Sequence, residues 1–190
     1  LESKGEIKID NGAALTADNI SLLVDADSDG VVKGIWANAT STVTVDSATL
    51  TATGKVLLQT RSEVDVNEDG DNFFSNGASL TVVTSFSSAL VDVRGSANIT
   101  APEVELDAFV DVSIVATPQA SSIKVIEVLA GADPKLHIGG TAQINATTSV
   151  VAKARSDMVI SATAQPGAAN NTANIDAAIV NVNVLDDPLN

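Results

Sequence analysis

The chain has 190 residues, of which 45% are hydrophobic and only 3% aromatic, and 24 acidic against 10 basic residues give a formal net charge of −14. This excess of acid argues against a protein that binds nucleic acid or anionic membranes. The lack of cysteine excludes a disulfide framework, and no stretch reaches the ~18 apolar residues of a membrane span. Scarce aromatic residues suit a thin core of Ala, Val, Leu and Ile rather than a thick one.

Strands are the only regular elements that the hydrophobic pattern predicts, because no segment has a convincing helical period. In chain order they are expected at residues 5–9, 12–17, 20–24, 42–45, 47–52, 55–59, 77–82, 88–93, 96–101, 104–114, 123–129, 135–138, 141–146, 150–155, 172–177 and 179–184. Residues 10–12 carry a turn signal, and Gly131 to Pro134 should separate two strands. The clearest alternation runs from Val104 to Ile114, with apolar residues at even positions and mostly polar ones at odd positions.

A six-residue phrase recurs in six of these segments: small–Ala–x–Leu/Ile–Thr/Asn/Asp–Ala/Val. The copies begin at Gly12, Ser47, Gly77, Ser96, Thr141 and Thr172. On a strand, the Ala, Leu/Ile and Ala of each copy share one face, and the polar residues share the other. Equivalent strands stacked about 4.8 Å apart would place each side chain on its own kind.

The phrase therefore predicts a single all-β domain over residues 1–190, a parallel β-helix (β-solenoid) with loop excursions. Its interior should contain one column formed by Leu15, Leu50, Leu80, Ile99, Ile144 and Ile175. The spacings of these residues are 35, 30, 19, 45 and 31, and we interpret the shortest as one bare coil. An antiparallel β-sandwich is the alternative, since many short strands with turn signals also suggest that fold.

Two acidic segments are expected to be calcium-binding loops. Asp25-x-Asp27-x-Asp29-Gly30 and Asp65-x-Asn67-x-Asp69-Gly70 match the core of known calcium loops, in which alternate oxygens of a tight turn converge on one cation. The predicted ligands are the side chains of Asp25, Asp27, Asp29, Asp65, Asn67 and Asp69 and the main-chain oxygens of Val31 and Asp71. Asp46, Glu63 or Asp71 could complete a site. An EF-hand is excluded, because Trp36 and Asn76 occupy the twelfth positions.

Other candidate residues favour structural roles. His137 is the only histidine and alternates with Leu136 and Ile138, so it should be an outward strand residue. One His and no Cys make zinc unpromising. We expect Phe73, Phe74 and Trp36 to tuck beneath neighbouring segments rather than to form an exposed binding tip.

The phrase and its surroundings, such as the run from Ala97 to Leu106, resemble the β-helical haemagglutinin-type and adhesin-type repeats of giant secreted bacterial surface proteins. The resemblance implies an extracellular, cell-surface rod module in adhesion or assembly, and it implies no site residues. The chain should then be a piece of a longer repeat protein or a filament subunit. Its expected partners are calcium, neighbouring copies or flanking repeats joined end to end, and cell-surface glycans.

A structural, non-enzymatic function is therefore expected. The alternatives are a β-helical polysaccharide lyase or epimerase, and a strand-exchanging β-sandwich filament subunit. The enzyme would need basic residues gathered with His137 or with carboxylates in a cleft.

Overall fold

The computed structural model describes residues 1–31, 35–68, 78–116, 123–162, 170–179 and 183–186. The regular elements in these residues are all β-strands. Their bounds are β1 Glu2–Ile9, β2 Ala14–Ala17, β3 Ile20–Val31, β4 Ile35–Trp36, β5 Asn38–Asp46, β6 Thr49–Ala52, β7 Lys55–Glu68, β8 Ala78–Arg94, β9 Asn98–Ala116, β10 Ile123–Ile138, β11 Gln143–Ala162, β12 Asn170–Ile179 and β13 Asn183–Asp186. Within this part of the chain, no helix is long and apolar enough to cross a membrane.

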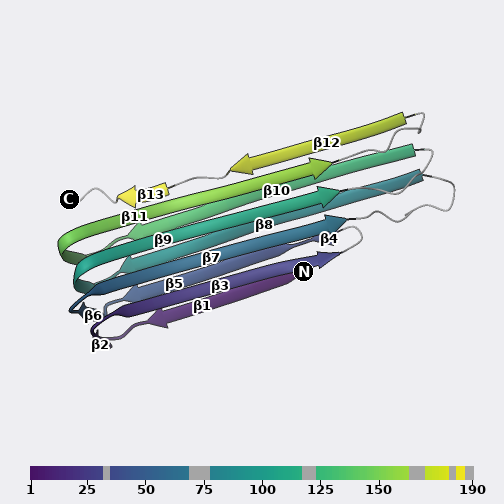
Figure 1. The fold of residues 1–190 in the computed structure, drawn as a ribbon. Coiled ribbons are helices and arrows are strands. Elements are labelled where there is room, and N and C mark those ends of the chain that lie inside the picture. The colour runs from purple at the N-terminus through teal and green to yellow at the C-terminus, as the bar shows by residue number, and fades with distance from the viewer. Residues whose placement is uncertain (32–34, 69–77, 117–122, 163–169, 180–182, 187–190) are drawn as a thin grey trace.

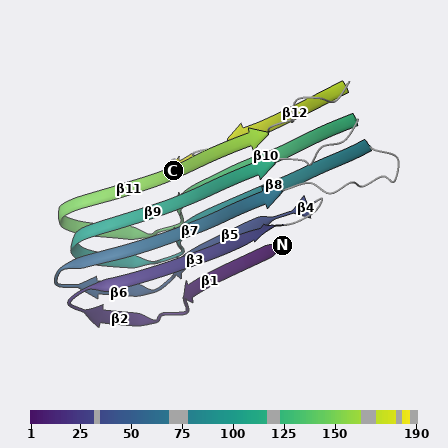
Figure 2. The ribbon, with the colours of Figure 1, turned by 45° about the vertical axis from the view of Figure 1, so that its right-hand side comes forward.

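The strands form two sheets, between which the chain passes back and forth (Figures 1 and 2). The first sheet, here called sheet A, has the order β1-β5-β8-β10-β12, with β4 on β8 and β13 on β10. The second, sheet B, has the order β2-β6-β9-β7-β3, with β11 also on β9. All strand pairs among the described residues are parallel. The antiparallel β-sandwich is therefore wrong for this part of the chain.

One passage of the chain through both sheets is here called a circuit. Residues opposite each other on β1 and β5 are 36 apart in sequence, as in the pair Glu2 and Asn38. Later circuits are longer: Thr40 lies opposite Ser88, 48 residues on. The 19-residue spacing from Leu80 to Ile99 is thus not a bare coil, because these residues lie on β8 and β9, which follow one another within one circuit but belong to different sheets.

The predicted stacking is confirmed for four of the six members of the column, of which Leu50 and Ile99 are fully buried. Leu15, Leu50, Ile99 and Ile144 lie opposite one another on β2, β6, β9 and β11. Leu80 and Ile175 were assigned wrongly, because they belong to sheet A, opposite Val125 and Val128. The phrase marks a strand segment that can begin in either sheet, so its sequence alone did not distinguish the two.

The core lies between the sheets and consists of aliphatic side chains, as the composition predicted. Fully buried residues include Val43, Val91 and Val93 from sheet A, and Val56, Leu58 and Leu106 from sheet B. The alternation from residue 104 to 114 is confirmed, since all its even-numbered residues are buried on β9. Ser41 and Ser62, on opposite sheets, join their hydroxyl oxygens at 2.8 Å inside this core. Their pairing satisfies two polar groups that burial would otherwise penalise.

The turns at one end of the circuits depend on glycine. The predicted turn at Asn11 and Gly12 is confirmed, and Gly12, Gly95 and Gly140 all have positive φ values, of 75°, 65° and 70°. A Cβ atom on Gly140 would lie 2.8 Å from the Gly95 carbonyl oxygen. Successive turns therefore stack too closely for a side chain at this position.

Two predicted breaks in the chain are continuous strand. Residues 25–31 belong to β3 rather than to a loop, because Ala26 and Ser28 point into the core and fix the extended alternation. Residues 131–134 lie within β10, where Pro134 and Leu136 face inward and continue the same pattern. In both places, burial of one face of the strand overrides the turn preference of the residues in the segment.

Candidate functional site

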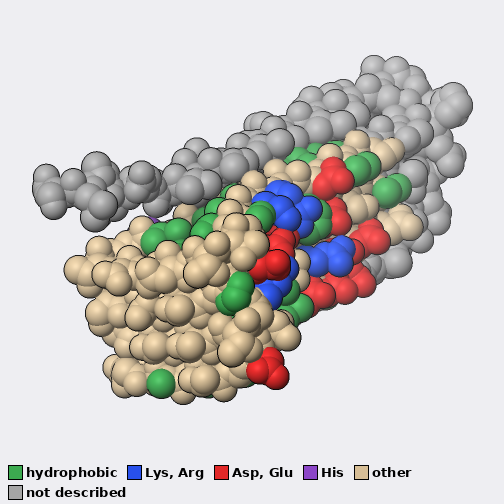
Figure 3. Space-filling model, turned by 60° about the vertical axis from the view of Figure 1, so that its left-hand side comes forward, with side chains coloured by type: hydrophobic (Ala, Val, Ile, Leu, Met, Phe, Trp, Pro, Cys, Tyr) green, Lys and Arg blue, Asp and Glu red, His purple; other side chains and the backbone are tan. Residues whose placement is uncertain are grey.

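Charged side chains gather on the outer face of sheet B, over strands β3, β7, β9 and β11. Residues directly opposite on neighbouring strands form lines across the sheet, here called rows. Because parallel strands lie about 4.7–4.9 Å apart, side chains of one row are in reach of each other. Figure 3 shows acidic and basic side chains side by side in this part of the surface.

The carboxylate of Glu105 on β9 joins the strands on both sides of it. It pairs with Lys55 from β7, and Lys153 Nζ of β11 donates to its Oε1 at 2.8 Å. The hydrogen bonds from Lys153 and then Lys55 lower the pKa of Glu105 to about 2. One carboxylate therefore links three consecutive strands, and it stays ionised over the physiological pH range.

A second cross-strand group surrounds Asp107, which is nearly buried. Arg155 donates two hydrogen bonds to it, from Nε to Oδ1 at 3.1 Å and from Nη2 to Oδ2 at 2.7 Å. The same guanidinium lies 4.7 Å from the centre of the Phe109 ring, and that of Arg61 lies 5.8 Å from it. Phe109 is thus held by cations from both neighbouring strands, an arrangement in which the ring quadrupole attracts each charge.

Beyond these pairs lie two rows dominated by acid, here called the acidic rows. Asp27, Glu63, Asp111 and Asp157 form the first, and Asp29 and Asp65 lie opposite each other in the second. Arg61 Nη2 compensates part of this charge, at 2.7 Å from Glu63 Oε2 and 3.6 Å from Asp111 Oδ2.

The pKa of Asp27 is raised in this acidic surrounding. A hydrogen bond with Asp29 and, after it, desolvation raise the pKa of Asp27 to about 6, and the charges of Asp29, Glu63 and Asp25 add to the shift. The acidic rows therefore favour the uptake of a proton, and by the same electrostatics they attract cations.

The predicted calcium ligands lie in a different geometry from a calcium loop. Asp25, Asp27 and Asp29 alternate along the extended strand β3, so their side chains spread along the sheet and do not converge as in a tight turn. Asp65 and Asn67 lie likewise on β7, and the Val31 main chain is in β3. Asp69 and Asp71 lie outside the described residues. Within the described part, no three His, Cys, Asp or Glu side chains are grouped so as to hold a metal ion.

The carboxylates suggested as completing groups separate in the fold. Glu63 lies opposite Asp27 in the first acidic row, as a neighbour of the predicted ligands. Asp46 is in sheet A, where Arg94 Nε donates to its Oδ2 at 3.0 Å. The first motif thus gains Glu63 but not Asp46.

His137 and Trp36 lie on sheet A. The prediction of an outward His137 is confirmed, since its side chain is 39% exposed. Its Nδ1 lies 2.8 Å from Asp92 Oδ1, and Arg94 Nη1 lies 3.0 Å from the other oxygen of Asp92. The expectation that Trp36 is tucked under a neighbour is wrong, since it is 66% exposed. Phe73 and Phe74 lie outside the described residues.

The comparisons with known proteins add no relative: no family model, no curated protein and no solved structure matches the chain.

Sequence reasoning missed the rows, which are the main feature of this surface. A signal was present, since Asp27, Glu63, Asp111 and Asp157 follow at intervals of 36, 48 and 46 residues. These intervals become meaningful only when the circuit lengths are known.

Proposed function

We propose that the chain is a structural module of an extracellular, bacterial surface-type rod, folded as a parallel β-helix and joined end to end with neighbouring copies or flanking repeats. Adhesion or surface assembly is the role that suits such a rod. The large acidic excess fits this setting.

The observation that carries the proposal is the difference in burial along one column. Leu50 and Ile99 are fully buried, whereas Leu15, opposite Leu50 on β2, is 36% exposed. Strand β2 ends the described order of sheet B, so it presents an unpaired edge together with a half-covered apolar side chain. Edges of this kind are templates for pairing with another chain.

The opposite end of sheet B has the same character. Strand β11 pairs with β9 alone among the described strands, and its inward residues Ile144, Met158 and Ile160 are only partly buried. In stacked repeats, each unit buries its apolar face against the next, and atypical polar units close the ends. An added circuit at either end would complete the burial that the interior circuits already have.

The charged face supports a stiff rod, because Glu105 and Asp107 tie β7, β9 and β11 together across the direction of stacking. We extend the proposal to calcium as the counter-ion of the acidic rows. Divalent cations that bridge carboxylates of neighbouring strands would offset the mutual repulsion of the acidic side chains around Asp27.

The experiment is sedimentation velocity over a wide range of protein concentration, with negative-stain electron microscopy of the heaviest fractions. The wild-type chain should form linear oligomers that lengthen with concentration. Leu15→Lys should remain folded and monomeric, because a lysine at an exposed edge can reach water but cannot be buried beneath an added circuit.

Thr16→Lys is the matched control, since Thr16 is the next residue of β2 and lies on the solvent face. It should assemble as the wild type does. Oligomers of Leu15→Lys equal to those of the wild type, or a wild type that stays monomeric at all concentrations, would refute end-to-end stacking through this edge.

A further inference from the structure

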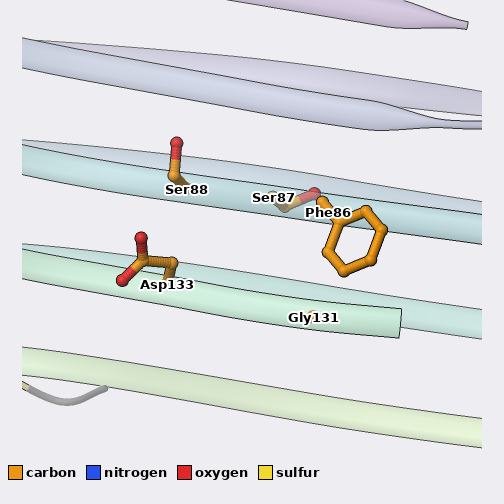
Figure 4. A pocket seen from close by; sticks show the side chains of 5 residues that line it. All are labelled: Phe86, Ser87, Ser88, Gly131 and Asp133. Carbon is orange, nitrogen blue, oxygen red and sulfur yellow. The ribbon is translucent and has the colours of Figure 1, made fainter. Parts of the chain in front are cut away.

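A hollow of about 250 Å³ lies on sheet A, away from the charged face of sheet B. Phe86, Ser87 and Ser88 of β8 and Gly131 and Asp133 of β10 line it. In Figure 4 the Phe86 ring lies beside Gly131, and Asp133 and Ser88 lie further along the same two strands. A cavity of ~150 Å³ is large enough for a benzene ring, so this hollow admits one planar group of similar size.

The hollow contains a glycine at the position where a similar row of sheet B has an arginine. Gly131 lies directly opposite Phe86, as Arg155 lies directly opposite Phe109. At Phe109, the guanidinium of Arg155 stacks at 4.7 Å from the ring centre and also pairs with Asp107. At Phe86, the ring is 47% exposed, Gly131 contributes no side chain, and the Asp133 carboxylate also lines the hollow.

The Asp133 carboxylate has capacity for a further donor. Lys135 pairs with its Oδ2. Its Oδ1 is shielded from water and accepts no hydrogen bond within the described structure. Buried carboxylate oxygens normally have a partner, and an N–H group placed in the hollow would supply one after a small rotation of the side chain.

We propose that this hollow binds the guanidinium group of an arginine side chain presented by a partner protein. The guanidinium stacks on Phe86, donates to Asp133 and takes the place that a side chain at position 131 would fill. Planar geometry and several donors in a fixed fork favour arginine over lysine, because one group can satisfy the ring and the carboxylate together. The net charge of −14 attracts such a basic segment from a distance.

The test is a titration followed by amide chemical shifts of the uniformly ¹⁵N-labelled chain, at physiological salt. The probe is the blocked tripeptide acetyl-Gly-Arg-Gly-amide, and its control is the same peptide with citrulline, which keeps the shape but not the charge. The arginine peptide should shift the amides of Phe86, Ser88, Gly131 and Asp133 with a dissociation constant on the order of millimolar. The citrulline peptide should bind at least fivefold more weakly.

Three variants separate the contributions. Phe86→Leu keeps apolar bulk without a ring face, and Asp133→Asn removes the charge, and each should weaken binding at least threefold. Gly131→Arg should place a guanidinium in the hollow from within the chain, which abolishes the peptide-induced shifts and raises the melting temperature. Gly131→Gln, of similar reach but uncharged, should not raise the melting temperature.

Equal binding of the citrulline and arginine peptides would overturn the proposal, since the hollow would then be a site for apolar or neutral ligands such as sugars. Shifts confined to the acidic rows around Asp27 and Asp111 would overturn it as well, because binding would then reflect the general negative charge. If Gly131→Arg does not fold, the Phe86 and Asp133 variants still decide the question.

Discussion

The clearest quantitative prediction compares leucine-to-alanine substitutions at two positions of one column. Leu50 is fully buried between Leu15 and Ile99, so Leu50→Ala leaves an enclosed cavity. It should cost about 3 kcal/mol of the free energy of unfolding, within the usual range of ~2–5 kcal/mol for such a change. Leu15 is 36% exposed at the edge, so Leu15→Ala opens a space that solvent or neighbouring side chains fill.

Because Leu15→Ala leaves no enclosed cavity, its cost is only the lost free energy of transferring the side chain out of water, in proportion to the buried share of that side chain. With roughly two thirds of a contribution of ~2 kcal/mol, the expected cost is about 1–1.5 kcal/mol. The two variants should therefore differ by about 1.5–2 kcal/mol, although the chemical change and the local sequence phrase are the same.

The assay is urea unfolding followed by circular dichroism, at a protein concentration where the chain is monomeric by sedimentation. The midpoints should shift at a nearly unchanged m value. Equal losses for both variants in the monomer would refute the reasoning, because they would mean that the β2 edge is already covered. At concentrations where the chain assembles, the cost of Leu15→Ala should rise toward that of Leu50→Ala.

Three further predictions concern the charged face. The pKa of Glu105 is lowered from 4.5 to about 2, so the stability that this carboxylate contributes is complete above pH 4.5 and is lost as the pH falls toward 2. In urea unfolding, the wild type should lose about 1 kcal/mol more of its free energy of unfolding than Glu105→Gln over this interval. Parallel pH profiles of the two proteins would contradict the lysine pairing. The pKa of Asp27 is raised from 3.8 to about 6, so its contribution is present below pH 3.8 and is lost as the pH rises through 6. Asp27→Asn should remove that loss of stability, which solvent screening limits to about 1 kcal/mol or less. If the variant keeps the pH profile of the wild type, the acidic rows are not the cause of the loss. Calcium should raise the melting temperature of the wild type, by a stabilisation equivalent to about 2.7 kcal/mol at a free calcium concentration 100 times the dissociation constant. Asp111→Asn should reduce this gain. Identical melting temperatures with calcium and with chelator would rule calcium out.

Several features of the fold could be predicted from the sequence because they depend on the backbone period alone. Alternation on a strand repeats every two residues, so the pattern from Val104 to Ile114 predicted both the strand and its buried face. Like residues at matching positions favoured parallel stacking, and the column of Leu15, Leu50, Ile99 and Ile144 has this arrangement. Low aromatic content agreed with a thin aliphatic core.

The first acidic segment was misjudged for a physical reason that the sequence does not display. Asp25, Asp27 and Asp29 have the composition of a calcium turn, and local propensity favours a turn for them. However, Ala26 and Ser28 between them are buried, and the free energy of that burial holds the segment extended. The preference of the solvent-facing residues was weaker than the packing of the inward ones.

What only the tertiary structure decided is the identity of the neighbours across strands. The sequence by itself determined which residues face outward, but the circuit lengths of 36, 48 and 46 residues determine that Asp27, Glu63, Asp111 and Asp157 share a row and that Gly131 lies beside Phe86. Register is a nonlocal quantity, set by turn geometry and by the packing of both sheets together. A circuit longer or shorter by two residues would preserve the alternation of every strand and still exchange every cross-strand pair, so the charged face and the hollow follow from register rather than from pattern.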